Sequence, residues 1–391
     1  MKKTRIVVAL AAIVVIAYAG VRTFVPSVIE GQMNQVQRDP INSVDASALA
    51  FHNSLIVGDW HADTLLWDRD ISEQAELGHV DIPRLQKGNV ALQMFTTVTK
   101  SPEGLNYEEN ATDAPDSITK LSLVQGWPVA TWTSLTARAI HQADKLSQMA
   151  SQYPDDLMLV TSQSSLATFL AKRESNPKLL GGLLGTEGSH ALDGKLENIQ
   201  VLYDKGFRMM SLQHFFDNKL GGSLHGTSQK GLSEFGQQAV QKMQALDIIV
   251  DVSHSSEQTV KDVLAISQAP LVISHTGFNG HCQSKRNIDD SLMQQIADGG
   301  GLIAVGYWDG AICKITANDV ADAIIYGINL VGVEHVSLGS DFDGGVTTSF
   351  DTSELSVITQ ALLQKNVPKQ SIAKVMGGNM LEFLQKQLPT N

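Results

Sequence analysis

Short apolar runs recur through the chain, and segments with a helical pattern lie between most of them. The runs are residues 55–58, 90–98, 180–186, 207–213, 248–253, 271–274, 302–306 and 335–340. The helical patterns include residues 236–246, 256–267, 289–298 and 318–327. Buried strands that alternate with helices indicate a parallel sheet. Eight such units predict an α/β fold, a (β/α)8 barrel of the TIM type.

An open, doubly wound sheet is the alternative, but no Gly-x-Gly-x-x-Gly follows the first run. The 391 residues exceed the length of about 250 that is usual for a barrel, so insertions are expected. The longest follows the second run, at residues 99–134, and contains Pro102, Pro115, Pro128, Trp127 and Trp132. We expect it to form a long loop over the mouth of the barrel.

The N-terminus has the pattern of a targeting segment. Lys2, Lys3 and Arg5 precede the apolar residues 6–19, a run that is short for a spanning helix but typical of a signal sequence. Ala17-Tyr18-Ala19 could be a cleavage site, yet apolar residues resume at Val21. Residues 1–25 are therefore expected to be a signal peptide or a membrane anchor, followed by a linker (26–47) and the barrel domain (48–391). In either case that domain is exported, to the periplasm or another extracytoplasmic space.

Composition excludes some classes of protein. Apolar residues make up 43% of the chain, enough for a large core, and the net charge is −12 without a basic stripe. Nucleic acid is therefore not an expected partner. The two cysteines, Cys282 and Cys313, are too few for a disulfide framework or a cysteine-rich zinc module, and the sequence leaves open whether they pair.

Side chains that can bind metals follow the predicted strands. His61 and Asp63 follow the first run, and because alternate strand residues share a side they can point to one place. The others lie near the ends of the third to sixth and eighth runs: Glu187, His214, His254, His275, Asp341 and Asp343. The carboxyl ends of all barrel strands share one face, where active sites lie. The pattern therefore predicts one cavity with several histidines and carboxylates, a donor set that suits zinc or manganese.

Each of these residues also has an ordinary structural explanation. A single His214 could be a hydrogen-bonded core histidine, Glu187 could lie beside a helix cap, and Asp341 and Asp343 could be turn residues. Their repeated occurrence at strand ends favours a site. Acidic pairs such as Asp155-Asp156 lack this context and are expected to be solvated.

Several motifs give the chain a family resemblance over about residues 50–385. They are Asp59-Trp60-His61-Ala62-Asp63, Glu187-Gly188-Ser189-His190, Ser211-Leu212-Gln213-His214, Gly231-Leu232-Ser233-Glu234-Phe235-Gly236, Asp251-Val252-Ser253-His254, Ala269-Pro270-Leu271-Val272-Ile273-Ser274-His275, Arg286-Asn287, Gly339-Ser340-Asp341-Phe342-Asp343-Gly344 and Gly377-Gly378-Asn379. The sequence resembles the membrane dipeptidases, which belong to the metal-dependent amidohydrolases. The family more often has Glu-Gly-Gly-His where this chain has Ser189.

The resemblance implies a binuclear zinc site. His61 and Asp63 would bind the first ion, Glu187 would bridge both, and His254 and His275 would bind the second. Such a pair of ions generates a hydroxide at neutral pH, which would attack the peptide bond.

The resemblance also implies roles for three other residues. His214 would contact the substrate and stabilise the oxyanion, and Asp341 would transfer the proton to the leaving amine. Arg286 would bind the free carboxylate of the substrate as a bidentate donor, although without the resemblance it would be taken for a surface arginine. Asp343 is expected to be structural.

The expected function is therefore that of an exported zinc-dependent dipeptidase. A related amidohydrolase that acts on N-acyl amino acids or lactams is one alternative. A metal-binding protein without activity is another, although Glu187 and Asp341 are both present. The expected partners are a small peptide, a membrane through the N-terminal segment alone and, from the resemblance, a second copy in a homodimer.

Overall fold

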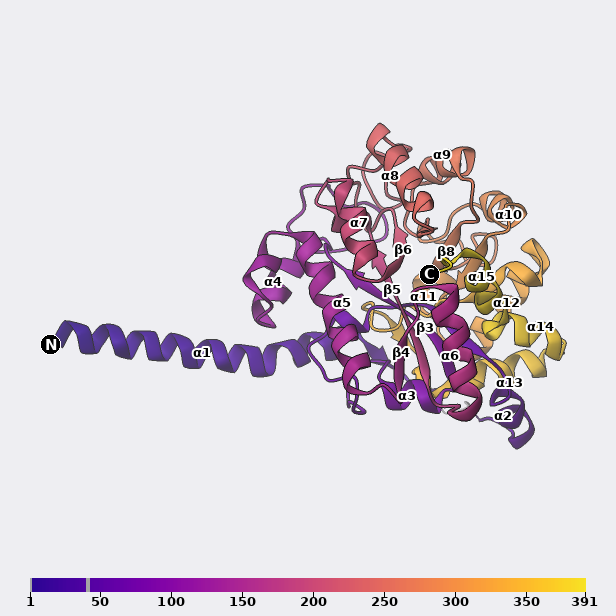
Figure 1. Ribbon diagram of the computed structural model, residues 1–391, viewed down its shortest axis with the longest axis horizontal. Coiled ribbons are helices and arrows are strands. Elements are labelled where there is room, and N and C mark those ends of the chain that lie inside the picture. The colour runs from indigo at the N-terminus through magenta and orange to yellow at the C-terminus, as the bar shows by residue number, and fades with distance from the viewer. Residues whose placement is uncertain (1, 40–42) are drawn as a thin grey trace.

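The structure, a computed structural model, describes residues 2–39 and 43–391 and has a ring of eight parallel strands at its centre (Figure 1). In ring order the strands are β2 (Val57–Ala62), β3 (Val90–Val98), β5 (Leu180–Glu187), β6 (Phe207–Ser211), β7 (Ile249–Asp251), β8 (Val272–Thr276), β9 (Leu302–Val305) and β10 (Val336–Leu338). A parallel bridge between Ala62 and Phe342 brings the last strand back to the first. The predicted barrel of the TIM type is confirmed.

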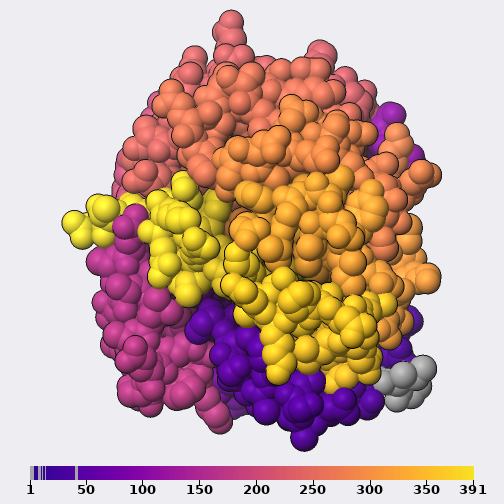
Figure 2. Space-filling view, turned by 90° about the vertical axis from the view of Figure 1, so that its right-hand side faces the viewer, coloured from indigo at the N-terminus to yellow at the C-terminus, as the bar shows by residue number. Residues whose placement is uncertain are grey.

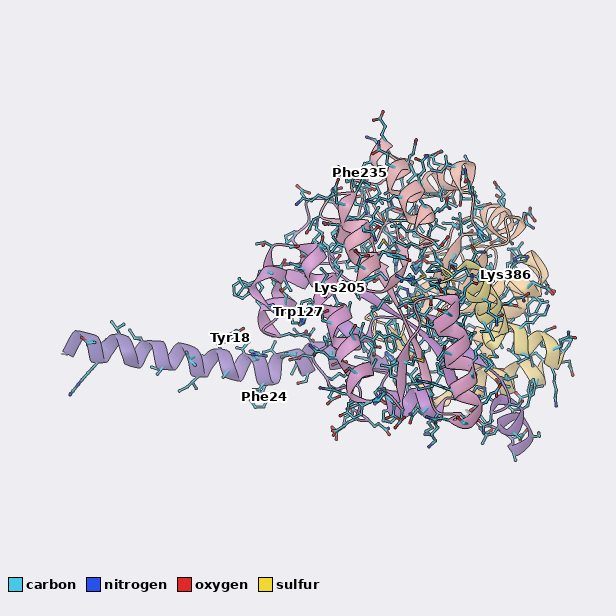
Figure 3. All side chains as sticks on the ribbon, in the orientation of Figure 1. Tyr18, Phe24, Trp127, Lys205, Phe235 and Lys386 are labelled. Carbon is cyan, nitrogen blue, oxygen red and sulfur yellow. A yellow bond between two sulfur atoms is a disulfide. The ribbon has the colours of Figure 1, made fainter. Side chains whose placement is uncertain are left out.

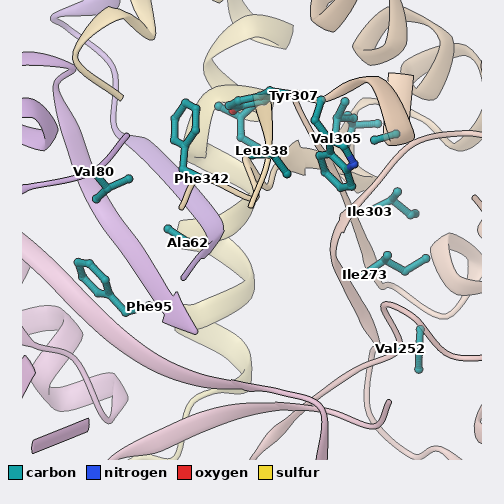
Figure 4. Close-up of a cluster of buried hydrophobic side chains, with 14 of the residues drawn as sticks. Ala62, Val80, Phe95, Val252, Ile273, Ile303, Val305, Tyr307, Leu338 and Phe342 are labelled. Carbon is teal, nitrogen blue, oxygen red and sulfur yellow. The ribbon is translucent and has the colours of Figure 1, made fainter. Parts of the chain in front are cut away.

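The strands read as continuous apolar runs because every residue in all eight is buried. Side chains from both ends of the chain meet in the core, among them Ala62, Phe95, Ile303 and Phe342 (Figure 4). On the surface, the C-terminal segments also lie beside the start of the barrel, as Figure 2 shows in yellow and indigo.

The helices surround this ring. They are α2 (Ala46–His52), α3 (Ile82–Lys87), α5 (Leu135–Gln152), α6 (Gln163–Ser175), α7 (Glu197–Asp204), α8 (Glu234–Ala245), α9 (Glu257–Ile266), α10 (Asp290–Asp298), α11 (Asp309–Ile312), α12 (Ala317–Val331), α13 (Ser356–Gln364), α14 (Lys369–Ala373) and α15 (Asn379–Gln387). The four helices expected from periodicity are α8, α9, α10 and α12, and each begins after a residue whose side chain accepts a hydrogen bond from the first turn: Ser233, Ser256, Asp289 and Thr316.

The insertion after β3 is more structured than the expected loop. It contains α4 (Ser117–Val124) and a short 3-10 helix (Val129–Trp132), and Arg138 of α5 pairs with Asp116 at 2.5 Å. A strand of only three residues, β4 (Leu157–Leu159), follows α5 and pairs with β5. The hydrophobic pattern did not predict β4.

The N-terminal segment forms a long helix, α1 (Lys2–Met33), which extends away from the barrel (Figure 1). Residues 26–47 were expected to be an unpatterned linker, but α1 continues through Pro26 to Met33 and a short strand, β1 (Gln35–Val36), pairs with β11 (Thr347–Thr348). A proline inside a helix removes one hydrogen bond and its ring crowds the carbonyl of the preceding turn, so contacts with the barrel are needed to hold this part of α1. Among the residues described here, no helix is both long and apolar enough to cross a membrane.

Candidate metal centre

Every residue predicted to bind metal lies at the same end of the barrel. His61 is the second-last residue of β2, and Asp63 follows that strand. Glu187 ends β5, His254 follows β7, and His275 is within β8. The first strand runs further than expected, so that His61 lies inside it. All five side chains are buried.

Glu187 lies between two possible ligand groups. It belongs to one with His61 and Asp63 and to another with His254 and His275. Its Oε1 atom is 3.5 Å from Nε2 of His61, 3.2 Å from Nε2 of His254 and 3.3 Å from Nε2 of His275. This shared position suits a carboxylate that bridges two cations.

Asp341 and His214 complete the ring of polar groups. The Asp341 carboxylate is 4.0 Å from Nε2 of His61. Nε2 of His214 is 3.3 Å from Oε2 of Glu187, and its Nδ1 is 3.0 Å from the carbonyl oxygen of Lys100. Both ring nitrogens of His214 therefore face acceptors, and both donate when the ring is protonated.

A serine that the sequence reasoning did not single out orients two of the histidines. The hydroxyl of Ser274 donates to Asp251 at 2.6 Å and lies 3.0 Å from Nδ1 of His61 and 2.9 Å from Nδ1 of His275. Because its proton is used on Asp251, Ser274 accepts from both rings, which leaves each Nε2 with a lone pair toward the cavity. A partner of this kind is typical of metal-binding histidines. In the sequence, the only sign of this role was that Asp251 and Ser274 lie within the motifs that end in His254 and His275.

The buried atoms that have no hydrogen-bond partner among the described residues include Nε2 of His61 and Oδ1 of Asp341. Nε2 of His254 and Nε2 of His275 also face each other at 3.0 Å. Buried polar atoms normally have partners, so lone pairs that converge without protons between them indicate a place for cations. Carboxylate and imidazole donors fit zinc.

The electrostatics show the same concentration of charge. Burial raises the pKa of Asp341 well above its usual value, and Glu187 and Asp63 add to this rise while His61 opposes it. Burial would also raise the pKa of Glu187, but the neighbouring histidines, His214 first among them, lower it well below its usual value. Carboxylates whose pKa values are shifted in opposite directions are typical of sites with divided roles.

The backbone is strained at two of these residues. His254 and Asp341 both have φ at +59°, in the left-handed region that non-glycine residues seldom adopt. Each such residue costs about 1–3 kcal/mol, and such residues cluster at functional sites. The rest of the barrel therefore holds these two side chains where local preference would not place them.

Arg286 is buried beside the second ligand group and is not a surface residue. Its Nη2 donates to the carbonyl oxygen of His275 at 2.6 Å and lies 3.3 Å from Nε2 of His254. Its guanidinium lies over the ring of Trp308, and its Nε has no acceptor among the described residues. The Nε–H group of Arg286 is therefore available to donate a hydrogen bond to a ligand.

Asp343 lies away from the cavity, as expected for a structural residue. Its carboxylate accepts from Thr64 at 2.9 Å and from the backbone N–H of His79 at 2.6 Å, and it pairs with Arg69.

Comparisons with known proteins found relatives of this chain. The family model for membrane dipeptidase (peptidase family M19) matches residues 45–389. The chain is 30% identical over 351 residues to dipeptidase aclJ from Aspergillus oryzae, covering 83% of this chain and 76% of that protein. It is 28% identical over 330 residues to an uncharacterized dipeptidase from Schizosaccharomyces pombe, covering 80% and 73%.

Solved structures with the same fold are more distant in sequence. A metallo peptidase from Rhodobacter sphaeroides, liganded with a phosphinate mimic of L-Ala-D-Ala, superposes with a TM-score of 0.69 at 20% identity, covering 85% of this chain and 99% of that one. The probable dipeptidase PvdM from Pseudomonas aeruginosa gives 0.69 at 19% identity, with 88% and 98% covered.

Proposed function

The chain belongs to the membrane dipeptidase family, and on that basis we propose that it is an exported, zinc-dependent enzyme that hydrolyses dipeptides. Membership makes it a metallo-dipeptidase, a hydrolase of peptide bonds. The observation that carries the finer proposal is the pair of buried ligand groups that share Glu187.

Two zinc ions are proposed to occupy these groups. His61 and Asp63 would hold the first, His254 and His275 the second, and Glu187 both. Ser274 prepares two of the histidines, and the hydroxyl of Thr96 donates to Asp63 at 2.6 Å, which orients that carboxylate. When bound, such a pair of ions would polarise the scissile carbonyl and lower the pKa of a water toward about 7.

Asp341 is proposed to move the proton. Its carboxylate, 4.0 Å from Nε2 of His61, would accept a proton from the attacking water and then give it to the leaving amine. His214 is proposed to donate from Nε2 to the oxyanion that forms on the substrate carbonyl. Its bond to the Lys100 carbonyl fixes the orientation of the ring for this.

Arg286 is proposed to bind the C-terminal carboxylate of the substrate. It lies beside His254 and His275, and its Nε has no acceptor among the described residues. A substrate carboxylate one residue beyond the scissile bond would accept hydrogen bonds from the guanidinium of Arg286. Dipeptides would therefore be the best substrates.

Hydrolysis of a small panel tests this function. Purified enzyme would be given a dipeptide, the same dipeptide as its amide, a tripeptide, a dipeptide with a D-residue second, and an N-acyl amino acid, each after chelation and again with zinc. We expect zinc-dependent cleavage of dipeptides, with the amide and the tripeptide far slower. Equal cleavage of the dipeptide and its amide would contradict the role of Arg286. A preference for the N-acyl amino acid would favour the related amidohydrolase.

Export has separate support. Cys282 and Cys313 form a disulfide, with 5.6 Å between their Cα atoms. Disulfides persist in oxidising compartments outside the cytosol, and an apolar segment with basic residues before it begins the chain. The native protein should therefore be found in the extracytoplasmic fraction with no titratable thiol. Free thiols in a cytosolic protein would contradict export.

A further inference from the structure

An apolar cavity of about 290 Å³ lies next to the candidate metal centre. Asp63, Glu187 and His214 form its inner end. Apolar side chains from three other parts of the chain surround it, namely Ile29, Met33, Leu66, Leu105, Leu121 and Val124. The cavity therefore continues from the site into a space that suits an apolar group.

Two of these side chains, Ile29 and Met33, come from the last turns of α1, before the residues 45–389 that the family model matches. Ile29 packs against a buried cluster formed by Leu66, Trp67, Val98, Ile118, Leu121 and Trp127. Val28, its neighbour on the same helix, is 56% exposed. One face of α1 is thus part of the cavity wall, and the adjacent face is in solvent.

Polar contacts fix this end of α1 in place. Glu30, only 4% exposed, pairs with Arg69 at 2.6 Å, and Arg69 also pairs with Asp343. The side chain of Asn34 accepts from the backbone N–H of Gly345 at 2.8 Å. The helix end is therefore tied to the loop that follows β10, the same loop that carries Asp341.

A contact further along α1 joins it to the insertion. The hydroxyl of Tyr18 donates to the carbonyl oxygen of Leu123, in α4, at 3.0 Å. In Figure 3 Tyr18 lies on the side of α1 that faces α4. The two walls of the cavity, α1 and α4, therefore support each other.

We propose that Ile29 and Met33 help to determine specificity, by forming part of the pocket for the side chain of the substrate's N-terminal residue. This rests on the proposed dipeptidase function. Arg286 would hold the C-terminal carboxylate near His254 and His275, whereas the cavity opens beside Asp63 and His214. A dipeptide that spans the site from Arg286 has its N-terminal residue at the cavity end.

The size and lining of the cavity define the preferred substrate. Its volume of about 290 Å³ is just below the range of roughly 300–1,000 Å³ for pockets that hold whole small molecules, so it fits one side chain and not a longer peptide. Dipeptides that begin with leucine or phenylalanine should be better substrates than those that begin with glycine. Residues 29 and 33 follow the Ala17-Tyr18-Ala19 sequence, so cleavage there would keep both side chains and remove only the contact between Tyr18 and Leu123.

The test compares Leu-Gly with Gly-Gly in the full-length zinc enzyme. Ile29→Trp should fill the cavity and lower kcat/KM for Leu-Gly about tenfold or more, as expected when a pocket loses room for methylene groups, while Gly-Gly changes less than about twofold since it enters no such pocket. Val28→Trp is the matched control and should leave both substrates unchanged. Ile29→Ala, a milder variant, should lower the Leu-Gly to Gly-Gly ratio a few-fold.

Three results would overturn the assignment. An unchanged ratio in both Ile29 variants, or an equal loss on both substrates, would show that the residue is structural only. The same drop in Val28→Trp would point to a general effect of the helix. If the unaltered enzyme cleaved neither dipeptide, the proposed function would fail and the pocket with it, whereas cleavage with an unchanged ratio would remove the pocket alone.

Discussion

Asp341 and Asp343 are two residues apart after the same strand, yet their surroundings are opposite. Asp343 is surrounded by donors, and although burial opposes it, Arg69 and His79 lower its pKa. Asp341 has an oxygen with no hydrogen-bond partner among the described residues, and burial raises its pKa well above the usual value. The contrast separates two uses of a buried carboxylate. A buried carboxylate whose oxygens all have partners within the protein stabilises the fold. A buried carboxylate with an oxygen that has no partner is available for a ligand or a proton.

The largest effect is expected from a change at Glu187, which both ligand groups share. Glu187→Gln keeps the shape but removes the negative charge between the two ligand groups, so metal content should fall and turnover should be abolished. Elemental analysis and steady-state kinetics measure both, with the exposed Glu197→Gln as control. Two zinc ions per chain together with near-normal activity would show that Glu187 is not a bridge.

Asp341→Asn should separate proton transfer from metal binding. The five other ligand positions remain, so zinc content should hold, while kcat should fall roughly 10²–10⁴-fold, the usual contribution of a general acid–base. KM should change much less, because the group acts mainly in the transition state. If zinc were lost in parallel with activity, Asp341 would be a ligand first.

Arg286 is a buried donor whose Nε has no acceptor among the described residues. Arg286→Ala should raise KM for a dipeptide roughly 10- to 100-fold, as expected for losing hydrogen bonds to a charged group. The dipeptide amide should be much less affected. Lys285→Ala, an exposed neighbour, is the control. An equal effect on the acid and the amide would place Arg286 outside substrate recognition.

Asp343→Asn should act on stability and little on chemistry. Removing one partner of a buried ion pair costs about 3–5 kcal/mol, and the low end is expected because Glu30 still pairs with Arg69. Since the folded-state pKa of Asp343 is lowered, its contribution is complete above the unfolded value of about 3.9 and declines as pH falls below it. Denaturant unfolding at pH 7 and pH 3 should show the difference from the unaltered protein shrinking in acid. A catalytically dead but fully stable variant would reverse the two assignments.

The ring of strands and the convergence of the candidate ligands could be predicted from the sequence because burial on both faces leaves continuous apolar runs, and the ends of these runs share one face of a barrel. Other features leave no such periodic signal. The strand β4 has three residues, too few for a pattern. The ordered end of α1 depends on tertiary contacts such as the Glu30–Arg69 pair. Ser274 is recognised as an orienting group only when His61 and His275 are seen to share it.

Titration of the metal-free enzyme with zinc tests most directly whether the two ligand groups that share Glu187 form a binuclear hydrolytic site. Activity on a dipeptide should be absent without metal, rise as zinc binds and reach its maximum at two ions per chain. Full activity in the metal-free enzyme, or a maximum that a single ion reaches, would contradict the assignment of both ligand groups.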